Sequence, residues 1–418
     1  MKSRIYFNIL YGISLFLISF DQIREGLRLN NFIFSLYGIG QEIIAFIIVM
    51  SIIFINRKKK YLRVNYVIVS LLLLFGYILL SVVIGLFSGV DINLVFRYGY
   101  RYLTIFIWIF IFFNMENISS FTYEKAIRIL LRYNLIIYFL SLYVYFVRPS
   151  FIYKNKIFNS RVSVGNPSIV SFQFFSLLII MLFFDLDIFK SKWKRNFYLI
   201  VMFLATVSTF TGTAMFTLVV LIIVGLFIRL LYRSSDFIFL KNIFIIIFIF
   251  VFIIVVISQN FDNSLEQFYD YFLFKSERIV QLIKVKLKLT NEPLLSRSYE
   301  IRDGQIKVAL ESIDKIYLLT GLGSGGYFLY VDGIENQYNA FLINYGIIGL
   351  FLYLCFLFSH FYYGLRRYNK YKILIVIIGI LMSIYSLTLE IFICYSIVTY
   401  YALIISYLYQ KSVIYKKN

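Results

Sequence analysis

The sequence predicts an all-α integral membrane protein with about twelve transmembrane helices and one long extracytoplasmic loop between helices 9 and 10. Hydrophobic residues make up 61% of the 418 residues, well above the roughly 45–50% typical of soluble domains. So much apolar side chain cannot be hidden inside a globule of this size, so lipid is the expected solvent. The apolar residues also occur in long runs. In lipid, a single run can pair all of its backbone N–H and C=O groups only by forming a helix.

Twelve apolar runs are expected to cross the membrane, counting roughly 20 residues for each crossing. The first is expected to remain as a span, because no small-residue cleavage site follows it. The runs divide the chain into membrane helices 1–9 (residues 1–257), an extracytoplasmic loop (258–337) and membrane helices 10–12 (338–418). Their bounds are 5–20, 32–55, 62–85, 94–114, 126–147, 168–184, 196–210, 213–231, 239–257, 338–360, 371–388 and 391–409.

Lysine and arginine are distributed unevenly between the loops. The loops on the side of the two termini carry 24 of these residues, the short loops of the other side carry 8, and the long loop holds the remaining 9. Basic residues favour the cytoplasmic side, so both termini are predicted to be cytoplasmic in a multi-pass protein of the cell membrane. The net charge of +20 lies in these clusters, so it indicates topology and no nucleic-acid partner.

The residue inventory gives little support to metal or cysteine chemistry. The chain has two cysteines, both in apolar runs, and a single histidine. The nearest approach to a metal motif is Asp185 and Asp187, at the end of a predicted span, where a solvated helix end is the better interpretation. No metal site is therefore predicted.

The predicted outer face is unusually cationic. Arg97 and Arg101 are four residues apart at the start of a span, so they share one helix face. Arginine forks match phosphate oxygens, whereas single cations also bind anionic lipid headgroups. The whole cluster favours a diphosphate ligand. Its other members are Arg148, Lys154, Lys156, Arg161, Arg297, Arg302 and Lys307.

Residues 297–326 contain a predicted helix followed by a glycine-rich turn. Apolar residues recur at helical spacing in this stretch, at Ile306, Ala309, Leu310, Ile313, Ile316 and Tyr317. Four glycines follow at 321, 323, 325 and 326. Glycines there allow positive φ and close backbone approach, so either a backbone nest for phosphate or a simple helix stop before the next span is predicted.

Three acidic residues stand in or beside apolar runs. Glu335 precedes a span on the outer side, where either a general base with a raised pKa or an ordinary helix N-terminus fits the position. Glu42 and Glu390 are costly in lipid, so each is expected to pair with an outer arginine for structural reasons.

Three segments resemble the superfamily of O-antigen ligases and Wzy-type polysaccharide repeat-unit polymerases. Residues 161–172, RVSVGNPSIVSF, are similar to that family's Arg…Asn-Pro approach to a mid-chain span. Residues 302–325 are similar to its arginine, helix and G-x-G turn, with Arg302 as the family arginine. The segment 335–354, ENQYNAFLINYGIIGLFLYL, is similar to the motif that ends its long loop. Two positions depart from the family pattern: Glu335 replaces a histidine of the ligases, and Ile306 replaces an aromatic residue.

The resemblance implies a metal-independent glycosyltransferase without a cofactor that joins repeat units carried on undecaprenyl diphosphate. It places Glu335 and Arg302 in catalysis. Substrate contacts are expected from Arg161, Arg297, Arg101, Arg97, Asn336 and Tyr338. The bilayer, a chain-length regulator and a flippase of the same pathway are the candidate partners. Two alternatives stay open: a flippase or transporter of lipid-linked oligosaccharides, and a glycan ligase of the same superfamily.

Overall fold

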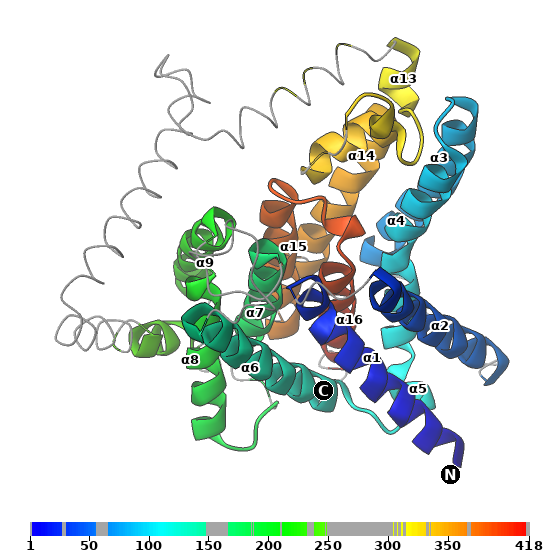
Figure 1. Cartoon of the computed structure of the whole chain (residues 1–418). Helices are drawn as coiled ribbons and strands as arrows, with labels where there is room; N and C mark the ends of the chain where they lie inside the picture. Colours follow the sequence, from blue (N-terminus) through cyan, green and yellow to red (C-terminus); the bar gives the residue numbers. More distant parts are fainter. Residues whose placement is uncertain are drawn as a thin grey trace, which may run out of the picture.

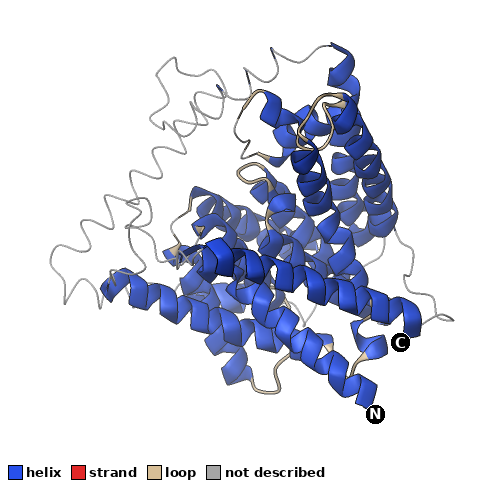
Figure 2. Cartoon of the chain, turned by 45° about the vertical axis from the view of Figure 1, so that its right-hand side comes forward, coloured by secondary structure: helices blue, strands red, loops and turns tan. Residues whose placement is uncertain are grey.

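The chain folds as a bundle of helices, and the described residues contain no β-strand (Figure 2). Thirteen α-helices and two short 3-10 helices are present in the part of the chain described here. The computed structural model describes residues 2–26, 31–55, 66–147, 166–184, 186, 188–209, 211–231, 238–246, 248, 304, 307, 311, 315–331, 334, 336–365 and 369–414.

The helices follow the expected apolar runs closely. Eleven of the twelve runs coincide with one helix each, and most of the ninth, 239–257, lies outside the described residues. The elements before the long loop are α1 (Lys2–Gly26), α2 (Asn31–Ile55), α3 (Tyr66–Phe87), α4 (Ile92–Phe113), α5 (Met115–Ile118), α6 (Tyr123–Val147), α7 (Pro167–Leu182), α8 (Lys192–Ser208) and α9 (Gly212–Leu231). Those after it are α13 (Lys315–Thr320), η2 (Gly326–Leu329), α14 (Gln337–Leu365), α15 (Lys370–Ser386), η3 (Ile391–Ile393) and α16 (Tyr395–Ile414).

Five of the described helices are long and apolar enough to cross a membrane, namely α3, α4, α6, α9 and α14. Apolar stretches of α1, α2 and α7 are shorter. The helical fold class is thus confirmed where the structure describes the chain, whereas twelve crossings and an external loop stay predictions.

Local sequence explains where several helices begin. Asp91 caps α4, because its carboxylate accepts hydrogen bonds from the backbone N–H groups of Asn93 and Leu94. Asn166 caps α7 in the same way, and Pro167 occupies the first helical position, where its missing N–H costs nothing. The Asn-Pro pair noted in the sequence is therefore a helix start.

Helix α7 forms the centre of its half of the bundle, and α6, α8, α9, α15 and α16 pack around it. Fifteen of its residues are buried, as expected for a helix that is apolar on all sides. Elsewhere in the bundle, α14 packs on α3, and α16 packs on α4 as well as on α7 (Figure 1).

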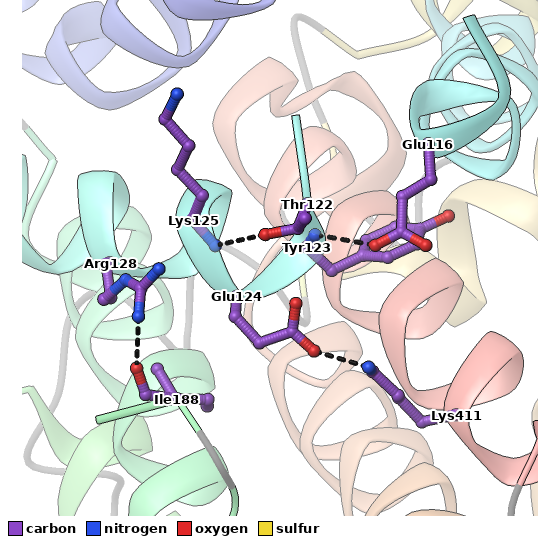
Figure 3. A network of polar contacts seen from close by, with 8 residues as sticks. All are labelled: Glu116, Thr122, Tyr123, Glu124, Lys125, Arg128, Ile188 and Lys411. Carbon is purple, nitrogen blue, oxygen red and sulfur yellow. Dashed lines mark hydrogen bonds and ion pairs between the residues drawn. The ribbon is translucent and has the colours of Figure 1, made fainter. Parts of the chain in front are cut away.

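One end of the bundle, here called the C-terminal end, is held by polar contacts among α6, α16 and the segment that precedes α8 (Figure 3). Nζ of Lys411 in α16 forms an ion pair with Oε1 of Glu124 in α6 at 2.6 Å. Nη1 of Arg128 donates to the carbonyl oxygen of Ile188 at 3.0 Å. Because both contacts join basic loops, they place several lysine- and arginine-rich loops at one end.

Further contacts add the start of α1 and the end of α14 to the C-terminal end. Nδ2 of Asn8 donates to Oγ of Ser120 at 2.7 Å. Oη of Tyr363 and Oγ of Ser412 lie 2.9 Å apart. The loops predicted to be cytoplasmic that are described here therefore gather together, as an alternating path of the chain requires.

The opposite end, here called the glycine-turn end, contains the α3–α4 loop, η2, the start of α14 and the α15–α16 connection. Oγ1 of Thr213, at the start of α9, donates to Oγ1 of Thr388 at 2.9 Å. Nδ2 of Asn336 donates to the carbonyl oxygen of Leu387 at 3.1 Å. These are the loops that the sequence assigns to the outer side.

Candidate functional site

The structure describes half of the predicted site residues. Arg97, Arg101, Asn336 and Tyr338 are among them. Their roles toward a substrate stay predictions. The predicted residues Arg161, Arg297, Arg302 and Glu335 lie outside the described residues.

Arg97 and Arg101 both lie in the first half of α4, as their spacing predicted. Arg97 is exposed, and Arg101 is half-buried. The guanidinium carbon of Arg101 lies 5.8 Å from the ring centre of Tyr98, within the range of a cation–π contact. The two cations therefore lie near one end of α4, with a buried aromatic ring beside them.

Asn336 and Tyr338 have structural partners at the start of α14. Oδ1 of Asn336 accepts hydrogen bonds from the backbone N–H groups of Tyr338 at 2.9 Å and Asn339 at 3.3 Å, which caps the helix. Oη of Tyr338 donates to the carbonyl oxygen of Ser383 at 3.1 Å. Both side chains fix α14 to α15, and this anchoring explains their place in the sequence without a ligand.

The glycine-rich turn is buried between α3, α4 and α14. Residues 321–327 are all buried. Gly323 lies so close to α3 that a Cβ atom there would be 2.1 Å from the backbone nitrogen of Gly85. The turn's amides are used within the protein: Leu322 N–H donates to Ile343 O at 3.0 Å, Gly323 N–H to Asn344 O at 2.8 Å, and Ser324 N–H to Ser81 O at 3.1 Å. These bonds support the helix-stop interpretation and leave those amides no role in a phosphate nest.

Helix α14 bends to receive this turn. Gly346 breaks the helical conformation with φ of 64°. A Cβ atom at Gly346 would lie 2.3 Å from the carbonyl oxygen of Leu319. The bend frees the carbonyls of Ile343 and Asn344, which accept the turn's amides. Gly346 therefore belongs to the same structural joint as Gly323.

A buried carboxylate joins the turn to α4. Glu390 is 4% exposed and lies in the connection between α15 and α16, outside both helices. Oη of Tyr102 donates to its Oε1, and Oη of Tyr327 donates to its Oε2 at 3.0 Å. Nε2 of Gln337 donates to Oη of Tyr102 at 3.2 Å. We call Glu390, Tyr102, Tyr327 and Gln337 the Glu390 network.

The sequence predicted an arginine partner for Glu390, and the structure differs. Its direct partners are two phenols, and Arg101 acts on it only through its charge. Burial raises the pKa of Glu390 to about 7, while the two phenols and Arg101 oppose that rise. Glu42 also interacts with the charge of Arg101. One guanidinium therefore attracts both carboxylates.

The described residues contain no group of three or more His, Cys, Asp and Glu side chains that could hold a metal ion. Lys307, predicted as an outer cation, forms an ion pair with Glu311 at 3.8 Å, and both side chains are largely exposed. Such a pair contributes little energy, so Lys307 stays accessible to solvent.

The Glu390 network was missed by sequence reasoning except for Glu390 itself. A carboxylate in an apolar run was a visible signal. Tyr102 and Gln337 carried none, because their partners lie 288 and 235 residues away in the chain. Chemically, the glycine-turn end offers two arginines beside an aromatic ring, and guanidinium groups are suited to an anionic ligand.

Searches for similar proteins gave no match for this chain, either among protein-family models or among curated protein sequences.

Proposed function

We propose that the protein polymerises oligosaccharide repeat units carried on undecaprenyl diphosphate into capsular, exo- or O-antigen polysaccharide at the outer leaflet of the cell membrane. The support is the three-segment resemblance together with one structural observation. Arg97 and Arg101 lie on α4 beside Tyr98, whose ring contacts Tyr327 of η2, and η2 follows the segment that carries Arg302 in the sequence. The cations of α4 thus lie next to the end of the predicted outer loop.

The proposed reaction has a growing glycan on its lipid carrier as donor and one lipid-linked repeat unit as acceptor. The acceptor hydroxyl oxygen forms a bond to the donor anomeric carbon, and the bond from that carbon to the diphosphate oxygen breaks. Undecaprenyl diphosphate leaves with the bonding electrons, and Glu335 takes the hydroxyl proton. Arginines, with Arg302 and Arg161 foremost, stabilise the charge on the leaving diphosphate, so the reaction needs no metal. The lipid carriers hold both substrates near the site.

The test is the glycan ladder of a strain that lacks the protein. Loss of every chain longer than one repeat unit, with single units still made and displayed, is the expected result. Normal chain lengths in that strain would refute the proposal. Single units that accumulate on the cytoplasmic side would indicate a transporter instead.

A transporter of lipid-linked oligosaccharides is the second candidate, and a specific observation favours it. Asp21, in α1 and one residue beyond the predicted span 5–20, is a buried acidic residue whose Oδ2 accepts a hydrogen bond from Ser396 Oγ at 2.9 Å. Ionisable side chains in membrane helices often mark transport pathways. A ligase of the same superfamily differs only in its acceptor, so purified acceptors distinguish it.

A further inference from the structure

The carboxylate of Glu390 calls for an explanation beyond packing. Burying a charged group is costly unless it is paired and hydrogen-bonded, and an apolar residue would fill the same connection more cheaply. Two phenol donors, Tyr102 and Tyr327, offset part of that cost, and both are themselves almost completely buried. This arrangement uses three large polar side chains to join elements that are distant in the sequence.

The network connects four elements. Tyr102 belongs to α4, Tyr327 to η2 and Gln337 to the first turn of α14. Oε1 of Gln337 also accepts a hydrogen bond from the backbone N–H of Phe392 in η3 at 2.9 Å. Loss of the carboxylate would therefore remove at once the hydrogen bonds that link Tyr327 of η2, through Glu390, to Tyr102 of α4 and to the α15–α16 connection.

Two routes lead from Glu390 to Arg101. The first is direct, because its partner Tyr102 is the next residue of α4. The second passes through Tyr327, whose ring lies 5.7 Å from that of Tyr98 in an edge-to-face contact. The guanidinium of Arg101 lies against the ring of Tyr98. Glu390 is thus linked to Arg101 both along α4 and through the Tyr327–Tyr98 ring contact.

Glu390 itself is not placed to touch a ligand. It is 4% exposed, and each carboxylate oxygen already accepts a phenol hydrogen bond. Its effect on a ligand must therefore be indirect, through Tyr102, through Tyr327 and Tyr98, or through its charge on Arg101.

We propose that Glu390 is a positioning residue that fixes η2 against the Arg97–Arg101 face of α4 and so sets the geometry of an anion-binding site. The assignment of the anion as a lipid diphosphate rests on the function proposed above.

The experiment compares Glu390→Gln and Tyr327→Phe with a matched control, Tyr353→Phe. The hydroxyl of Tyr353 is equally buried and bonds Ser386 between α14 and α15, outside the Glu390 network. All variants and the full-length wild type are purified in detergent. Three quantities are measured for each: the melting temperature, amide hydrogen exchange of η2, and affinity for undecaprenyl diphosphate.

The expected result is faster exchange of the η2 amides in Glu390→Gln and Tyr327→Phe than in Tyr353→Phe, even when the melting temperatures fall equally. Affinity for undecaprenyl diphosphate should fall about tenfold in the first two variants, the lower range for losing a group that orients a ligand-binding residue. The control should bind as the wild type does.

Two results would overturn the proposal: η2 exchange that matches the control, or faster exchange with wild-type affinity, which would leave Glu390 a purely structural role. A third outcome has a different meaning: faster η2 exchange in Glu390→Gln and Tyr327→Phe than in the control, with no binding of undecaprenyl diphosphate by any of the proteins, the wild type included. It would uphold the bracing of η2 and refute the diphosphate of the proposed function.

Discussion

Replacing Gly323 with alanine should destabilise the protein strongly, because two separate costs add at this position. Gly323 has φ of 87°, and a left-handed conformation costs an L-residue roughly 1–2 kcal/mol. The new Cβ atom would also lie 2.1 Å from the nitrogen of Gly85 and 2.7 Å from the carbonyl oxygen of Ser81. Both are backbone atoms, so relief requires α3 to move, and such overpacking costs about 1–3 kcal/mol. The expected loss of unfolding free energy is therefore about 2–5 kcal/mol.

Gly89→Ala provides the matched control. Gly89 also has positive φ, 79°, but no atom lies within 4 Å of its added Cβ. It should therefore lose only the conformational part, roughly 1–2 kcal/mol. Thermal unfolding of both purified variants, followed by the fluorescence of buried Trp108, measures the difference. Equal losses in the two variants would refute the close docking of the glycine turn on α3.

A membrane-impermeant thiol reagent should label Asn93→Cys but not Ser120→Cys on intact cells, in a chain without its two native cysteines, because both positions are exposed and lie at opposite ends of the bundle. Labelling of the second variant alone would invert the orientation. The pKa of Glu390 is raised to about 7 from a usual 4.5, so its contribution to stability is complete below pH 4.5 and is lost as pH rises through 7. The wild type should therefore lose on the order of 3 kcal/mol between low pH and pH 8, whereas Glu390→Gln should lack this slope; parallel pH profiles would contradict the raised pKa of Glu390. If Glu335 is the base, Glu335→Gln should slow polymerisation about 10²–10⁴-fold, whereas near-normal chains would remove it from catalysis.

Much of the helical framework could be predicted from the sequence because its cause is local. Long apolar runs form helices wherever they are described, and Asp91 and Asn166 begin helices for reasons visible within three residues. The start of α7 also shows why an Asn-Pro pair stands there. The run 391–409 was placed four residues too early at its start, because residues 391–394 are apolar but form η3 and an extended residue rather than α-helix.

The joint between the glycine turn and the bundle could not be predicted in the same way. Glycines at 321–326 left both a nest and a helix stop open, and the choice depended on Gly85 and Gly346 from distant segments. The partners of Glu390 had the same difficulty. A buried carboxylate in a membrane protein is costly, so Glu390 was expected to have a hydrogen-bonding or charged partner. The sequence alone could not tell whether that partner is a tyrosine or an arginine. Arg101 was predicted as a ligand-binding cation, but the contact of its neighbour Tyr98 with Tyr327 depends on the fold.

Polymerisation by the purified protein tests the central claim most directly. The protein in detergent or nanodiscs is given the undecaprenyl-diphosphate-linked repeat unit alone, with EDTA, and the products are separated by length. A ladder of chains with release of undecaprenyl diphosphate is predicted, and Arg302→Ala should reduce its rate about 10²–10³-fold, with Arg302→Lys intermediate because lysine lacks the bidentate fork. Single repeat units left unextended by wild-type protein would contradict the account, as would a ladder that EDTA abolishes and Mg²⁺ restores.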